Sequence, residues 1–186
     1  MKRNLLVVIL MCSINLFGQD TKPGQLSFGV EQDVLPYVLS GYIVTGWMGR
    51  DFVRCRFSYA EAQTPQFMLQ TGIGKDKVNA FGISLEYFFK ENFEGWWLGP
   101  GVGFWTNNLE SEDMGQAKNE SVIFSFGGGY NYFITRWLYT SPWIALHTRV
   151  SGTDLLDVSD ASYKPIILTP ELSIKLGVKF SKLNRN

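Results

Sequence analysis

Cysteine, charge and long apolar runs are all scarce in this chain of 186 residues. Of its two cysteines, Cys12 falls in an N-terminal segment that we expect to be removed, so Cys55 would remain alone and no disulfide is predicted. Beyond that segment no apolar run reaches the roughly 18 residues that suggest a transmembrane helix. The formal net charge is zero, which gives no sign of nucleic acid as a partner. One histidine and one remaining cysteine offer no ligand spacing, so no metal and no other cofactor is predicted.

Residues 1–19 have the pattern of a signal peptide. A positively charged start is followed by an unbroken apolar run that ends at Met11, and this run is too short to span a bilayer, which takes about 20 helical residues. We expect cleavage near Gln19, which leaves residues 20–186 as one domain. The alternative is a lipid anchor at Cys12, but Met11 precedes it where lipoprotein signals usually carry a small residue.

Alternation of apolar and polar residues predicts β-strands through most of the remaining chain. The clearest example is residues 170–180, where Leu172, Ile174 and Leu176 share one face and Ser173 and Lys175 share the other. Successive side chains of a strand point to opposite faces, so such a segment has one apolar and one polar side. Eight segments show this pattern: residues 25–33, 42–48, 52–59, 80–89, 96–105, 122–132, 143–150 and 170–180.

The connections between these segments alternate in length. The short ones are residues 49–51, 90–95 and 135–136, and the longer ones are residues 34–40, 61–77, 107–120 and 151–166. Transmembrane β-barrels of the bacterial outer membrane have short periplasmic turns and longer external loops. The prediction is therefore an all-β fold, an eight-stranded antiparallel up-and-down barrel in the bacterial outer membrane, with both termini in the periplasm.

The distribution of glycines and aromatic residues favours a barrel with its apolar face outward. Glycines and charges gather on one face of the predicted strands, as a narrow lumen requires, and the opposite face is apolar. Aromatic residues gather near strand ends, where membrane barrels carry interfacial girdles. The predicted girdle comprises Phe89, Trp96, Trp97, Trp105, Tyr130, Tyr132 and Trp137. A soluble barrel of the lipocalin kind, which would bind a ligand inside an apolar lumen, is the less favoured alternative.

Four segments carry a resemblance to a known group of proteins. They are residues 80–89, 95–99, 126–130 and 169–177, which read AFGISLEYFF, GWWLG, FGGGY and TPELSIKLG. Together with the signal, they resemble small eight-stranded outer-membrane β-barrel proteins of the kind found in Bacteroidota. The resemblance implies insertion by the barrel-assembly machinery, which reads the last strand and its terminal aromatic residue. Phe180 would be that residue, although six residues follow it here.

Charged side chains share the predicted inward face of the barrel. An eight-stranded barrel is about filled by its side chains, so we expect these groups to pair in a polar network that plugs the lumen. The network is predicted to contain Glu31, Arg54, Arg56, Glu86, His147, Arg149, Glu171 and Lys175.

No catalytic residue is predicted from the sequence. A nucleophile and its base on one strand face need a serine two residues from the histidine, but Ala145 and Arg149 flank His147 at that spacing. Other serines would have to approach through the fold. The expected role is therefore non-enzymatic, structural or in protein interaction. The alternatives are an enzyme that modifies lipid A or phospholipid, and a narrow channel.

Lipid and lipopolysaccharide of the outer membrane are the expected surroundings. Carboxylates in the predicted external loops are expected to form a solvated surface, and the alternative is that they share divalent cations with lipopolysaccharide phosphates. A protein partner, if there is one, would be expected at loops 61–77, 107–120 and 151–166.

Overall fold

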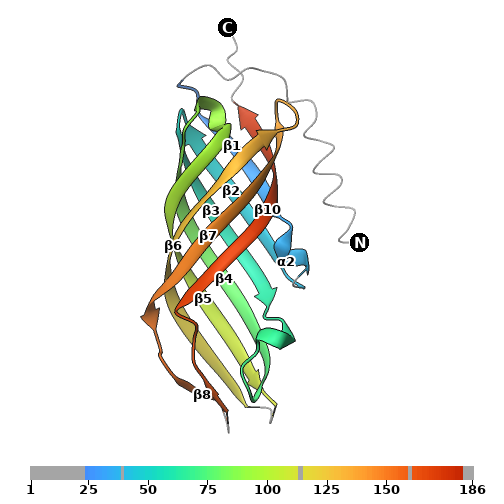
Figure 1. Ribbon diagram of the computed structural model, residues 1–186, viewed down its shortest axis with the longest axis vertical. Coiled ribbons are helices and arrows are strands. Elements are labelled where there is room, and N and C mark those ends of the chain that lie inside the picture. Colours follow the sequence, from blue (N-terminus) through green and yellow to red (C-terminus); the bar gives the residue numbers. More distant parts are fainter. Residues whose placement is uncertain (1–23, 39, 113–114, 159–160, 182–186) are drawn as a thin grey trace.

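Eight antiparallel strands form a closed barrel in the computed structural model, which describes residues 24–38, 40–112, 115–158 and 161–181 (Figure 1). Each strand pairs with its neighbour along the chain, and the first strand pairs with the last to close the ring. The strands are β1 (Ser27–Asp33), β2 (Tyr42–Arg50), β3 (Val53–Gln63), β4 (Ile73–Phe88), β5 (Gly95–Ser111), β6 (Gln116–Phe133), β7 (Leu138–Gly152) and β10 (Leu168–Ser181). The predicted fold class is confirmed.

Closure of the barrel removes the free strand edges that would otherwise invite aggregation. Phe28 of β1 lies opposite Phe180 of β10, and their rings stack with centroids 5.5 Å apart on the outer surface. Among the described residues, no helix is long and apolar enough to cross a membrane. The predicted signal, residues 1–19, lies outside the described part of the chain.

The two ends of the barrel differ in their connections. At one end, which we call the turn end, β1 begins and β10 ends, and the strands are joined by residues 51–52, 89–94 and 134–137. The connection from β4 to β5 contains the short helix η3 (Glu91–Phe93). At the opposite loop end the connections are residues 34–41, 64–72, 112–115 and 153–167. They contain α2 (Leu35–Val38), η2 (Gln66–Met68) and the small hairpin of β8 (Leu156–Val158) and β9 (Ala161–Tyr163).

Three of the predicted external loops are shorter than expected because the strands continue into them. Of residues 107–120, only 112–115 connect β5 to β6, and residues 61–77 and 151–166 also lie partly in strands. The outward side chains of these extensions are polar, for example Thr106 and Asn108, so the apolar pattern that marks a strand ends before the hydrogen-bond ladder does. The prediction of a long third loop was wrong for this reason.

An apolar belt surrounds the middle and the turn end of the barrel. Outward residues such as Leu172, Phe104 and Leu85 are about half exposed, with exposed fractions of 69%, 59% and 53%. Beyond the belt, the outer face of the strand extensions carries exposed ion pairs, including Lys77 with Glu61 at 2.9 Å. The exterior is therefore apolar along the part of the barrel that all eight strands form together. It is polar where β4, β5 and β6 extend beyond the other strands at the loop end (Figure 1).

Two tryptophans of the predicted girdle point into the barrel. Trp97 and Trp105 each follow an outward aromatic residue by one position, so their side chains point to the opposite, inward face. Trp97 is 4% exposed, and the Trp105 ring lies against His147. Placing these two in the girdle was wrong. The other members lie on or near the outer surface at the turn end: Phe89, Trp96, Tyr130, Tyr132 and Trp137.

Candidate functional site

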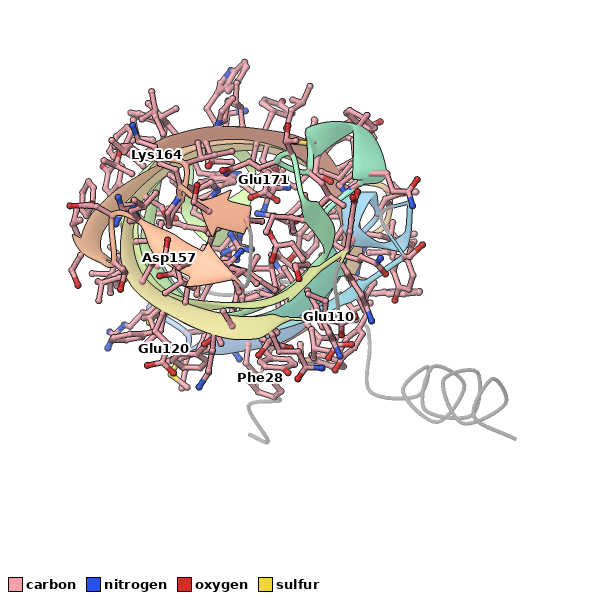
Figure 2. All side chains as sticks on the ribbon, turned by 90° about the horizontal axis from the view of Figure 1, so that it is seen from below. Phe28, Glu110, Glu120, Asp157, Lys164 and Glu171 are labelled. Atoms are coloured by element: carbon pink, nitrogen blue, oxygen red, sulfur yellow. The ribbon has the colours of Figure 1, made fainter. Side chains whose placement is uncertain are left out.

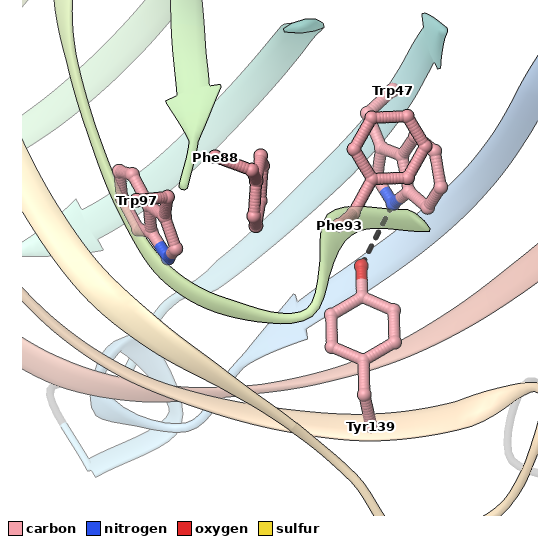
Figure 3. Close-up of a cluster of buried hydrophobic side chains, with 5 residues drawn as sticks. All are labelled: Trp47, Phe88, Phe93, Trp97 and Tyr139. Atoms are coloured by element: carbon pink, nitrogen blue, oxygen red, sulfur yellow. Dashed lines mark hydrogen bonds between the residues drawn. The ribbon is translucent and has the colours of Figure 1, made fainter. Parts of the chain in front are cut away.

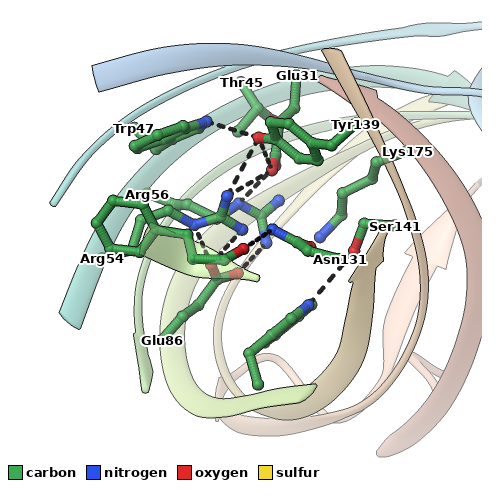
Figure 4. A network of polar contacts seen from close by, with 12 residues as sticks. Glu31, Thr45, Trp47, Arg54, Arg56, Glu86, Asn131, Tyr139, Ser141 and Lys175 are labelled. Carbon is green, nitrogen blue, oxygen red and sulfur yellow. Dashed lines mark hydrogen bonds and ion pairs between the residues drawn. The ribbon is translucent and has the colours of Figure 1, made fainter. Parts of the chain in front are cut away.

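The half of the lumen nearer the turn end contains a compact cluster of buried charges (Figure 4). Arg54 contacts Glu31 at 2.9 Å and Glu86 at 2.5 Å. Arg56 contacts the same two carboxylates, Glu31 at 3.1 Å and Glu86 at 2.6 Å. Each carboxylate is thus held by both guanidinium groups. Strand pairing explains part of this arrangement, because Arg54 lies directly opposite Glu86 between β3 and β4.

Lys175 of β10 joins this cluster from the opposite wall. Its ammonium group lies 4.3 Å from the ring centre of Trp143 and 4.8 Å from that of Trp97, and its Nζ has no hydrogen-bond partner among the described residues. Two aromatic faces thus contact a lysine whose side chain is 1% exposed. Three basic side chains thus face the carboxylates of Glu31 and Glu86.

A layer of aromatic side chains packs against this charge cluster, and Figure 3 shows its members. Its members are the buried side chains of Trp47, Phe88, Phe93, Trp97 and Tyr139. Phe93 reaches the lumen from the connection between β4 and β5, where it adopts a φ of 63°. The layer is bonded to the charges, since the Tyr139 hydroxyl donates to Glu31 at 2.6 Å and accepts from the Trp47 indole at 2.8 Å. Charges and rings together fill this half of the barrel.

The half of the lumen nearer the loop end contains a second polar group. Ser125 of β6 lies directly opposite His147 of β7, and its Oγ is 2.7 Å from the Nδ1 of that histidine. The Nε2 of His147 is 2.8 Å from an oxygen of Glu171, on β10. Sequence reasoning missed Ser125 because it searched the histidine's own strand. The contact could have been found from the turn at residues 134–137. Counting residues back from this turn along both strands places Ser125 opposite His147.

A cavity of about 150 Å³ lies next to His147 at the loop end. Its wall includes Trp105 and Arg149, together with Asp76 of β4 and apolar residues of the loops such as Ile166. Asp76 accepts hydrogen bonds from Asn107 at 3.0 Å and from Thr64 at 3.0 Å. Burial raises the pKa of the Asp76 carboxyl, and these hydrogen bonds oppose that shift.

The β8–β9 hairpin lies across the loop-end opening of the barrel (Figure 2), and Tyr163 of the hairpin lines the cavity. Val158 and Tyr163 of the hairpin pack against Ile73 of β4 and Leu109 of β5, and all four side chains are buried. This small apolar core lies above the belt, on the inner face of the strand extensions. The fourth loop is therefore a folded cover rather than a loose segment.

The structure divides the predicted polar network into three groups. Glu31, Arg54, Arg56, Glu86 and Lys175 lie together at the turn end. His147 and Glu171 form the separate pair nearer the loop end. Arg149 contacts Asp154 at 2.8 Å in the fourth loop.

The described residues contain no group of three or more His, Cys, Asp or Glu side chains that could hold a metal ion. Cys55, in β3, is a free cysteine.

Comparison with known proteins supports the fold alone. No family model and no curated protein matches the sequence. Among solved structures, the chain is similar to Neisserial surface protein A, with a TM-score of 0.57 and 13% identity over 84% of this chain and 95% of that one. The N-terminal β-barrel domain of Pseudomonas aeruginosa OprF gives a TM-score of 0.44 at 14% identity, over 87% of this chain and all of that one. The first likeness identifies the class of fold, a small closed β-barrel.

Proposed function

We propose that this protein is an integral barrel of the bacterial outer membrane with a lumen closed to conduction and a structural or interaction role. The observation that carries the proposal is the layer of paired charges and packed rings across the turn-end half of the lumen. An ion would have to displace Arg54 or Lys175, which are 0% and 1% exposed, and displacing Arg54 would leave Glu31 and Glu86 each short of a partner in a closed space. This role requires no catalytic step.

The exterior of the barrel supports a location in the outer membrane. Half-exposed Leu, Ile, Val and Phe side chains around the whole ring would be costly in water and favourable in lipid. A soluble barrel would have the opposite arrangement, with its apolar side chains inside. The lipocalin-like alternative is disfavoured for this reason.

The same exterior supports an orientation. The first strand, β1, begins at the turn end and the last strand, β10, ends there, and we propose that this end faces the periplasm. The loop end, with its polar strand extensions and folded hairpin, would then project from the outer leaflet among lipopolysaccharide. Residues 1–19 would serve as the export signal, and β10 with Phe180 as the segment read by the barrel-assembly machinery. The specific likeness to Bacteroidota proteins stays a prediction.

Any protein partner would bind at the loop end. The surfaces available there are the connection at residues 64–72, the extensions of β5 and β6 and the hairpin cover. The predicted partner loops 61–77, 107–120 and 151–166 are thus replaced by a more rigid surface, in which strands and a small apolar core fix the positions of the side chains.

Two measurements test the proposal. Outer-membrane fractions should contain a band that changes its gel migration on boiling, because folded membrane barrels resist detergent. The purified barrel in planar lipid bilayers should then give no discrete conductance, while a porin recorded under the same conditions shows that insertion is detected. Discrete openings that change when Arg54 is replaced would establish the narrow channel instead. A soluble periplasmic location would exclude the membrane role altogether.

A further inference from the structure

The hydrogen-bonded chain of Ser125, His147 and Glu171 has no part in closing the lumen. An ionised carboxylate only accepts hydrogen bonds, so the Nε2 of His147 carries the proton that it donates to Glu171. The Nδ1 is then an acceptor, and the Ser125 hydroxyl donates to it at 2.7 Å. A serine is thereby paired with a base, and that base is oriented by a third group. This is the arrangement that activates serine nucleophiles on unrelated folds.

Ser125 is also more accessible than the buried inward serines. Ser27 and Ser141 are 2% and 0% exposed, whereas Ser125 is only half-buried. Its neighbour across the β5–β6 ladder is Gly101, which has no side chain to cover it. Farther along the same wall, a methyl group added at Gly82 would meet only one backbone oxygen, at 3.7 Å. At Gly101 itself a methyl group would meet the Cβ of Ser84 at 3.1 Å, so the open space lies farther along this wall, at Gly82.

The adjacent cavity supplies room for a substrate and a donor for developing negative charge. Its volume of about 150 Å³ equals that of an engineered protein cavity known to hold benzene. His147 and Arg149 line it, whereas Ser125 and Glu171 are not part of its wall, so the cavity meets the hydrogen-bonded chain at His147. The Arg149 side chain is 8% exposed, and its Nε has no hydrogen-bond partner among the described residues. A buried donor without a partner would be satisfied by an anionic oxygen in the cavity.

We propose that Ser125 is a nucleophile that takes the acyl group of small carboxylic esters, with His147 as its general base and Glu171 as the positioning residue. The Ser125 Oγ attacks the ester carbonyl carbon while its proton passes to Nδ1 of His147. The bond to the leaving alcohol breaks, and that proton moves to the alcohol oxygen. Water then attacks the acyl-serine, again through His147, which releases the carboxylic acid and restores the serine. This activity is additional to the proposed membrane role, which would stand without it.

The decisive experiment is active-site labelling of the folded full-length barrel in detergent. A fluorophosphonate with a fluorescent reporter should label the protein, and peptide mass spectrometry should place the adduct on Ser125. We expect Ser125→Ala to abolish labelling and His147→Gln to slow it by about 100-fold, the range that general-base catalysis supplies. Hydrolysis of p-nitrophenyl acetate and butyrate should be lost in the same variants, and p-nitrophenyl palmitate should be a poor substrate because its chain exceeds the cavity.

Matched variants separate a chemical role from a structural one. Ser84 lies across Gly101 from Ser125 on the inward face, outside the Ser–His–Glu chain, so Ser84→Ala should label like the parent. Glu171→Gln should both slow labelling and change its dependence on pH, whereas a merely structural residue would leave the pH profile in place. Each variant is first checked for boiling-dependent migration. A folded parent protein without label, or label that persists in Ser125→Ala, would overturn the proposal.

Discussion

The two halves of the lumen are built from similar residues but packed to different extents. Toward the turn end, five charged side chains and an aromatic layer occupy the interior, and Arg54, Phe88 and Tyr139 are each 0% exposed. Toward the loop end, His147 and Glu171 stay partly exposed beside a cavity of about 150 Å³. Complete filling gives closure and rigidity, whereas incomplete filling leaves space in which a ligand can meet a polar group.

The halves also differ in how carboxylates are compensated. Glu31 and Glu86 each contact two arginines at the turn end. At the loop end, Asp76 is held by the neutral donors Asn107 and Thr64. Charged partners recover more of the cost of desolvation than neutral ones, so removing a partner should matter most in the turn-end half.

Arg54→Met should give the largest loss of stability. The substitution leaves Glu31 and Glu86 short of one guanidinium each in a closed interior, and breaking a buried pair costs about 3–5 kcal/mol. Urea unfolding of the barrel in detergent, followed by tryptophan fluorescence, measures this change. Arg50→Met is the matched control, because its ion pair with Asp51 is exposed and exposed pairs contribute less than about 1 kcal/mol. Equal effects in the two variants would show that the cluster is not a stabilising unit.

Leu109→Ala should have a smaller and more local effect. Leu109 is 1% exposed and packs against the hairpin cover, so truncation should destabilise that cover by about 2–5 kcal/mol. Because the barrel ladder does not depend on this core, we expect faster protease cleavage within residues 153–167 while boiling-dependent migration is retained. Phe88→Ala at the turn end provides the contrast, since it should weaken the whole barrel. Loss of the folded band in Leu109→Ala would mean that the two halves unfold together.

Alanine at two inward glycines sharpens the difference in packing. A methyl group at Gly177 would lie 2.3 Å from the Tyr139 ring, so Gly177→Ala should cost about 1–3 kcal/mol through overpacking. At Gly82, the nearest atom would be 3.7 Å away, and Gly82→Ala should leave the free energy of unfolding almost unchanged. The same urea titration compares the two. A cost at Gly82 as large as that at Gly177 would contradict the open space inferred at Gly82, on the wall that carries Ser125.

Strand periodicity was sufficient to predict the fold and the inward charges because lipid outside and a narrow lumen inside impose opposite demands on alternate residues. The periodicity failed where the strands extend beyond the lipid, because the outward side chains there are polar as well. Asn108 and Glu110 continue the outer face of β5 with polar side chains, so the residue pattern predicts a loop where the strand continues. Trp97 and Trp105 were assigned by residue type and not by parity, although their outward neighbours already fixed their direction.

Contacts across the barrel were harder to predict than positions on a face. The facing of Arg54 and Glu86 follows from one hairpin register, but Glu31 and Lys175 reach the same cluster only through ring closure and strand tilt. The Ser125–His147 contact depends on the register of a single hairpin and could have been predicted from the sequence. The cavity could not have been predicted, because it results from how residues 153–167 fold back over the loop end of the barrel.

Asp76→Asn should give the smallest effect, and one that depends on pH. Burial raises the pKa of this carboxyl above its unfolded value of about 3.9, so the folded state binds the proton more tightly than the unfolded state does. The stabilising contribution is therefore fully present below about pH 4 and is lost as the pH rises through the folded pKa. The free energy of unfolding of the parent, relative to Asp76→Asn, should fall over that window. Asp157→Asn removes one charge from the exposed surface of the hairpin and controls for net charge. A difference between parent and Asp76→Asn that stays flat with pH would mean that the loop end solvates Asp76 as well as water does, and the contrast between the two halves would then rest on packing alone.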